Sequence, residues 1–179
     1  MEPLMIDEEK SRYKSWSNLK KQMNDLLCDS LKKSISYFYT SYHEVHNAYG
    51  RAAIIYNKKE LAAFSWVEMH EQDQDIICLR QGDGTKSYNE LLQEKWMPER
   101  TLCEANFIDS VTVFLKTDIA VSLHSDNYLL RIFAYMDRRA GKRTLAKNRD
   151  EVGQLPEWVK QFYQIRCEAE GLFPEKPGN

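Results

Sequence analysis

The sequence lacks the features that mark several special classes of protein. Seven glycines and five prolines among 179 residues are too few for a collagen-like or low-complexity chain. The four cysteines lie far apart, with no CxxC or CxxH pair, which argues against a disulfide scaffold and a zinc knuckle. The net charge is only −2, so the chain is not a globally basic nucleic-acid-binding protein.

Long apolar runs are missing as well. The first ten residues, MEPLMIDEEK, contain no basic region followed by an apolar stretch, so no signal peptide is predicted. No run approaches the ~20 apolar residues that span a bilayer. We therefore expect a cytoplasmic, soluble protein without a membrane partner. Its cysteines are then reduced thiols that pack as small apolar groups.

The residues that are present indicate a globular protein. The chain is 42% hydrophobic and 29% charged, which excludes a disordered chain. Its length suits a single domain over residues 1–179. Within it we expect a flexible segment over 1–14, a helix plus β-meander over 15–81, and a helical half over 85–173. The turn signal Gly82-Asp83-Gly84 separates the last two parts.

The pattern in the first half changes from helical to strand-like. From Ser15 onward, apolar residues recur at steps of three and four, which predicts a helix. Aromatic and β-branched residues then fill three short segments, 35–42, 51–56 and 61–67, and 76–79 is a fourth candidate. Short polar connections favour an antiparallel meander. The predicted fold class is α+β: an N-terminal helix, an antiparallel β-meander of three to four strands, and a C-terminal helical half.

The C-terminal half carries helical periodicity, most clearly in its last segment. Pro156 suits a first helical turn, Gly171 is a candidate C-cap, and Pro174 prevents continuation. The apolar residues between them step by four and three: Trp158, Phe162, Ile165, Ala169 and Leu172. Earlier helices are predicted over 87–96, around 107–115, after a cap within 125–127, and over 142–148.

A dense group of cations is the main candidate for a binding site. Six lie among the twelve residues 138–149, with no acid: Arg138, Arg139, Lys142, Arg143, Lys147 and Arg149. The first four flank Gly141, where the backbone can turn and present several cations to a phosphate, a carboxylate or an acidic partner. The competing interpretation is structural. Such cations also offset a helix dipole or pair with nearby acids: Asp137, Asp150, Glu168 and Glu170.

Other chemistry-bearing patterns are weaker. His43 and His46, with Glu44 between them, are spaced like metal ligands, but no third ligand is near in sequence. We expect no metal and no cofactor. Tyrosines between residues 37 and 56 could stack on bases, yet no RNP-like pattern accompanies them. The acidic stretch 68–75 is expected to be a solvated loop. No nucleophile or phosphate-loop motif is present, so no catalytic residue is predicted.

The turn and the last helix carry a resemblance to a family. Residues 137–145 read D-R-R-x-G-K-R-x-L, and residues 166–172 read R-x-E-A-E-G-L. Together with segments 16–35 and 49–54, they resemble a family of small bacterial cytosolic proteins. That resemblance implies no reaction, cofactor or catalytic residue. By size and fold alone, it is loosely similar to immunity proteins that neutralise bacterial toxins.

Three functional hypotheses follow. The leading one is a non-enzymatic module, of immunity or regulatory type, that binds another protein. The second is nucleic-acid or anion binding through residues 138–149. The third is an enzyme of unknown class built on the histidines at 43 and 46. If Arg138 and Arg139 are buried against Glu168 and Glu170, the cations are scaffold; if they face solvent, a ligand is indicated. The oligomeric state is left open.

Overall fold

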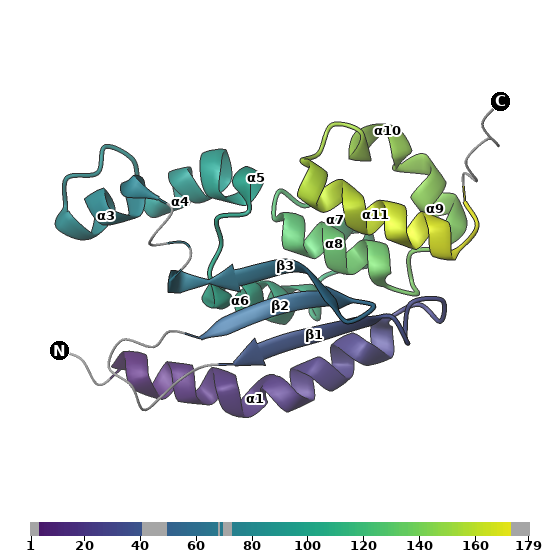
Figure 1. Cartoon of the computed structure of the whole chain (residues 1–179), viewed down its shortest axis with the longest axis horizontal. Coiled ribbons are helices and arrows are strands. Elements are labelled where there is room, and N and C mark those ends of the chain that lie inside the picture. The colour runs from purple at the N-terminus through teal and green to yellow at the C-terminus, as the bar shows by residue number, and fades with distance from the viewer. Residues whose placement is uncertain (1–3, 41–49, 68, 70–72, 173–179) are drawn as a thin grey trace.

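The computed structural model describes residues 4–40, 50–67, 69 and 73–172, with the backbone alone for 4–14 and 80. It is an α+β protein: an N-terminal helix, a three-stranded antiparallel sheet, then a series of helices (Figure 1). This confirms the predicted fold class. Within the described ranges, no helix combines the length and the apolar character needed to cross a membrane.

The first helix and the sheet follow the predicted order. Helix α1 (Leu4–Leu26) begins eleven residues before the expected start at Ser15. It leads to β1 (Ile35–Thr40), β2 (Arg51–Tyr56) and β3 (Lys59–Ser65), paired as an antiparallel β1-β2-β3 meander. Between β2 and β3, Asn57 and Lys58 have φ values of 47° and 67°. Two such residues in succession make the turn that matches the twist of a tight hairpin.

The fourth strand candidate is wrong, because residues 76–79 belong to a helix, α3 (Gln74–Gln81). The side chain of Asp73 accepts a hydrogen bond from Asp75 N at the start of this helix, and Gly82, with φ of 81°, ends it. A run of four apolar residues does not distinguish a strand from one buried side of a helix. The cap at its start was the informative signal.

The helical half is confirmed. Its first segment continues through a π-helix, and the side chain of Asn127, within the expected cap, accepts from Leu129 N at the start of α8. The elements are α4 (Tyr88–Leu91), η1 (Leu92–Trp96), α5 (Met97–Glu99), α6 (Glu104–Phe114), α7 (Ile119–Leu123), α8 (Tyr128–Met136), α9 (Lys142–Lys147), α10 (Arg149–Val152) and α11 (Glu157–Ala169).

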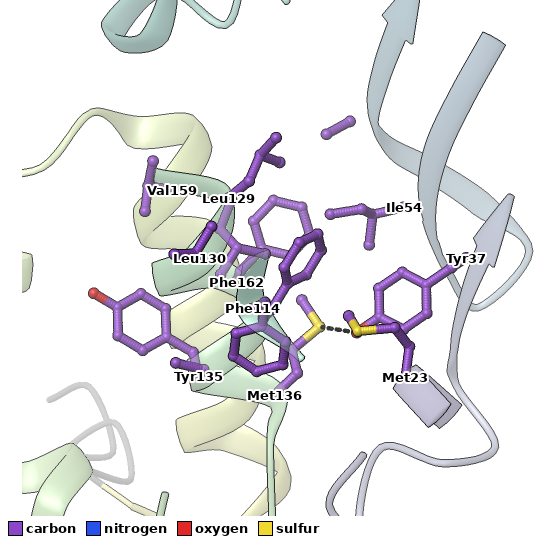
Figure 2. Packing of buried hydrophobic residues seen from close by; sticks show 14 of the residues in the cluster. Met23, Tyr37, Ile54, Phe114, Leu129, Leu130, Tyr135, Met136, Val159 and Phe162 are labelled. Atoms are coloured by element: carbon purple, nitrogen blue, oxygen red, sulfur yellow. Dashed lines mark hydrogen bonds between the residues drawn. The ribbon is translucent and has the colours of Figure 1, made fainter. Parts of the chain in front are cut away.

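The main core lies between one face of the sheet and helices α1, α6, α8 and α11 (Figure 2). Tyr37 meets the ring of Phe133 on α8 edge-on at 5.9 Å between centroids. Phe64 stacks on Phe107 of α6 at 5.5 Å. This core draws on residues from both sides of the Gly82 turn. The tyrosines of β1 that face it are therefore unavailable for base stacking.

A second, smaller core lies beneath α3, α4 and η1. Its buried members are Met69, Ile76, Leu91, Trp96 and Cys103. Asp73, only 4% exposed, accepts a hydrogen bond from the indole nitrogen of Trp96 at 2.7 Å and pairs with Lys95 at 3.0 Å. Asp73 thus departs from the expected solvated loop. The carboxylate joins α3 to η1 at the edge of this second core.

Helix α11 has the predicted bounds but a rotated buried face. The buried residues are Val159, Phe162, Tyr163, Arg166 and Cys167. Of the predicted apolar stripe, Phe162 is fully buried, whereas Trp158 and Ile165 are partly buried and Ala169 is exposed. The rotation brings an arginine, Arg166, into the interior beneath the basic group of residues.

Candidate functional site

The cation-rich residues 138–149, called the basic segment below, begin in a turn that is fastened to the end of α1. Cys28 N donates to Met136 O at 2.9 Å, and Arg138 N donates to Leu26 O at 2.8 Å. These two bonds pair the chain after α1 with the chain after α8. The start of the basic segment is therefore held by backbone hydrogen bonds from a part of the chain more than a hundred residues away.

Arg166 of α11 holds the same turn from the other side. It is 3% exposed, and its guanidinium donates to the carbonyl oxygens of Tyr135 at 2.8 Å and Asp137 at 3.0 Å. A third bond reaches Ala140 O at 2.9 Å. These oxygens lie at the C-terminal end of α8 and just beyond it, where a positive charge is favourable.

Arg139 is partly structural. The carboxylate of Asp137, whose side chain is fully buried, accepts hydrogen bonds from the Arg139 backbone N at 2.7 Å and from its Nη2 at 2.7 Å. The hydrogen bond to Asp137 raises the pKa of Arg139. The arginine also lies over the ring of Phe114 at 5.7 Å. This pairing with Asp137 was one of the alternatives left open by the sequence.

The contacts between the turn and the last helix differ in their partners from the Arg–Glu pairs that the structural interpretation allowed. Glu170 lies 3.3 Å from Arg166 Nε and 3.6 Å from Lys142 Nζ, and it accepts from Ser30 Oγ at 3.0 Å. Lys142 also donates to Glu170 O at 2.9 Å. Helix α11 is thus joined to the turn through Lys142 and through a buried arginine that the sequence argument did not use.

The remaining cations face solvent. Arg138 is exposed near Asp29, whose pKa is lowered first by Lys32 and further by Arg138. Arg143 and Lys147 are exposed, and neither forms a hydrogen bond or ion pair with any residue in the described part of the chain. Of the four predicted site residues, Arg139 and Lys142 therefore contact the scaffold through their side chains. The side chains of Arg138 and Arg143 face solvent.

Two placements in α9 run against helix stability. Lys142 and Arg143 occupy its first turn, where the helix dipole is positive and cations are unfavourable. Arg143 and Lys147 are four residues apart, on one side of the helix, where like charges repel by a few tenths of a kcal/mol. The negative end of the helix dipole favours a cation at Lys147, in the last turn of α9. It does not favour one at Arg143, in the first turn.

A hollow of about 400 Å³ lies beside the basic segment, between α10 and α11. Arg149 and Val152 line one side, and Lys160, Gln164 and Glu168 line the other. The residues on α11 recur every four positions and so share one face of that helix. Sequence reasoning missed this hollow, because its two walls meet only through the tertiary fold.

The other candidates give no site. His43 and His46, with Glu44, lie outside the described residues. Across 4–40, 50–67, 69 and 73–172, no group of three or more histidines, cysteines and carboxylates could hold a metal ion. The four cysteines are free, and three of them are buried. Burial raises the pKa of the Cys103 thiol to about 11, so this thiol is not activated as a nucleophile.

Comparison with curated proteins and with solved structures gives no match. One protein-family model does match, and it covers residues 15–167. That range includes α1 from Ser15 onward, the sheet, the whole basic segment and most of α11 up to Cys167. The chain belongs to the SF0329 protein family.

Proposed function

We propose that this protein is a binding module that recognises an acidic partner protein through its basic segment. The observation that carries the proposal is the placement of Arg143 and Lys147. Both are exposed without a partner among the described residues. Arg143 lies in the first turn of α9, where a cation is unfavourable, and its like charge repels Lys147 one helical turn away. A ligand of opposite charge would explain why the chain carries cations here that lower the stability of α9.

The hydrogen bonds that hold the basic segment in place support the proposal. The turn before α9 is tied to α1 by backbone bonds and to α11 by Arg166 and Lys142. Helix α9 itself is tied to α11, because the Tyr163 hydroxyl donates to Leu145 O at 2.6 Å. A surface that is already rigid loses little conformational entropy on binding, so more of each contact contributes to affinity.

A protein partner fits the charges better than a nucleic acid does. Acidic residues lie around the basic segment: Asp29 is near Arg138, and the exposed Asp150 and Glu168 lie on α10 and α11. A continuous phosphate backbone would meet these carboxylates as well as the cations, and its affinity depends on the number of phosphates neutralised. A partner with separate acidic patches avoids this repulsion.

The finer form of the proposal is a bacterial protein of immunity or regulatory type. Such a module inhibits or holds one dedicated partner, which is commonly encoded by a neighbouring gene. The resemblance of the turn and closing helix supports the bacterial origin. The immunity or regulatory type is supported by the loose similarity in size and fold alone, together with the absence of a predicted catalytic motif. The product of the adjacent gene is therefore the partner to test first.

The test is co-purification with that gene product at low salt, using a charge-reversal pair. The double variant Arg143→Glu/Lys147→Glu should lose the partner, with an affinity at least tenfold weaker by titration. The control is Lys58→Glu/Lys59→Glu, which makes the same change in net charge on exposed residues of the β2–β3 turn and should bind like the wild type. Equal binding by both double variants would contradict the proposal.

A second titration addresses the nucleic-acid alternative. A fluorescein-labelled DNA duplex is added to the wild-type protein at increasing salt concentrations. For binding to phosphates, the logarithm of the association constant should fall with log salt at a slope of about −0.9 per phosphate contact. If this is observed, and the 143/147 variant abolishes the binding, the partner is a nucleic acid and not a protein. We expect no duplex binding at physiological salt.

A further inference from the structure

The hollow between α10 and α11 adjoins the basic segment without a break. Helix α9 ends at Lys147, Asn148 follows, and α10 begins with Arg149, which lines the hollow. Its volume of about 400 Å³ falls in the usual range for ligand pockets, about 300–1,000 Å³. A partner that lies on α9 therefore reaches the hollow within a few residues.

The hollow has an apolar floor. Val152, Tyr163 and Cys167 line it and are buried, and the partly buried Leu172 lines it as well. The hydroxyl of Tyr163 already donates to the main chain of α9, so the ring presents carbon to the hollow without an unpaired polar group. An apolar side chain would lose no hydrogen bonds on entering.

The rim of the hollow is charged unevenly. Arg149 lines the hollow together with Tyr163 and Cys167. Lys160, paired with Glu157 at 2.8 Å, lines the same hollow. Glu168 lies two helical turns further along α11. An acidic segment would therefore place its carboxylates toward Arg149 and away from Glu168.

We infer that this hollow is the anchor site for the acidic partner: it receives one apolar side chain, such as phenylalanine or leucine, from a segment whose carboxylates lie on Arg149 and the cations of α9. The inference rests on the proposed function and adds to it the kind of segment recognised. Apolar anchors that fill a pocket contribute most of the binding energy at protein interfaces. The surrounding charges set the rate of encounter and the orientation.

The probes are two short fluorescein-labelled peptides, both runs of glutamate, one of which carries a phenylalanine at its centre. Fluorescence polarisation with the full chain measures both affinities. The phenylalanine peptide should bind about tenfold more tightly, because burying the ring in the hollow removes apolar surface from water. The 143/147 charge-reversal variant should weaken both peptides alike.

A filled hollow supplies the matched control. Gln164→Trp places an indole on an exposed lining position of α11 and should remove the preference for phenylalanine while leaving the all-glutamate peptide unchanged. Gln22→Trp, an equal change at an exposed position of α1, should keep the preference. Circular dichroism and the urea midpoint verify that both variants fold.

The outcomes separate the two proposals. Equal affinity of the wild type for both peptides overturns the anchor site but leaves binding through Arg143 and Lys147 standing. No binding of either peptide contradicts both. If the wild type is a dimer by light scattering and Gln164→Trp makes it a monomer, the occupant is a second copy of the chain, and the anchor proposal is overturned.

Discussion

Arg166 donates hydrogen bonds to three carbonyl oxygens from one buried guanidinium. Its position in α11 places the end of α8, the turn before α9 and Glu170 around a single charge. Arg139 and Lys142 of the basic segment share in holding this region, through Asp137 and Glu170, whereas Arg143 does not. At the residue scale, Arg166 is therefore part of the scaffold, and Arg143 is a displayed charge.

This separation predicts unequal effects of two similar substitutions. Arg166→Met keeps most of the side-chain volume but leaves buried carbonyl oxygens without donors, so it should lower the free energy of unfolding by about 3–5 kcal/mol. Arg143→Met, at an exposed site, should stay within about 0.5 kcal/mol of the wild type. Urea unfolding followed by circular dichroism measures both. Similar midpoints for the two variants would refute the structural role of Arg166.

Helix α3 illustrates how one carboxylate fixes an element. Asp73 accepts from Asp75 N at 2.8 Å, from Trp96 Nε1 and from Lys95 Nζ. Burial raises the pKa of Asp73, but the hydrogen bonds from Lys95, Asp75 N and Trp96 outweigh it, so the pKa is lowered overall from its ordinary value of 3.8. A carboxyl with a lowered pKa stabilises the folded state above that ordinary value, and this stabilisation is lost as pH falls through the lower folded value.

At the element scale we therefore predict a pH-dependent effect of Asp73→Asn. The amide keeps the cap but loses the charge, so the variant should be about 1–2 kcal/mol less stable at neutral pH. The difference should close as pH falls below 3.8, because only the wild type then loses its charged contacts. Asp126→Asn, at an exposed site, is the control. A difference that persists unchanged in acid would exclude the charge as its cause.

Some helices and strands are determined by their local sequence, whereas others depend on contacts with distant parts of the chain. Helix α11 and the β2–β3 hairpin could be predicted, because caps, turns and periodicity are local properties. The four apolar residues within α3 could not, since so short a run fits both strand and helix. The buried face of α11 could not be predicted from apolar periodicity alone, because it includes Arg166, whose carbonyl partners come from a distant turn.

The residues of the candidate site could be predicted from the sequence, but the role of each side chain could not. The sequence located the cations at 138–149, yet charge alone does not show that Arg139 lies on a buried Asp137 while Arg143 faces solvent. Partner choice depends on geometry that only the tertiary fold sets. The hollow beside α10 had no sequence signal, because its walls are joined by the packing of α9 against α11.

At the scale of the whole molecule, the described residues form two cores of unequal size. The main one spans the sheet and most helices, whereas the second gathers five buried residues near α3 and η1. Polar contacts join the two parts, among them Trp158 Nε1 to Pro98 O at 3.0 Å and Trp66 N to Glu104 Oε2 at 2.9 Å. A core with few buried residues opens at a lower free energy than a large one.

At this scale we predict two levels of protection in native-state hydrogen exchange. Amides of α3, α4 and η1 should exchange through a partial opening that leaves β2, α6 and α8 protected. Trp96→Ala, in the second core, should lower protection mainly in α3 to η1. Phe107→Ala, in the main core, should lower it throughout. A single shared opening free energy for all helices would contradict this division.

The fastening of the basic segment to both α1 and α11 has a consequence for synthesis. The ribosome releases α1 first, and Arg166 emerges well over a hundred residues later. Until then, the carbonyl oxygens at the end of α8 lack the donor that Arg166 supplies, and the turn before α9 has its bonds to α1 and its local bonds to Asp137, but none to α11. The basic surface therefore takes its final shape only after translation has passed α11, so a nascent chain that stops short of that helix would not present it to a partner.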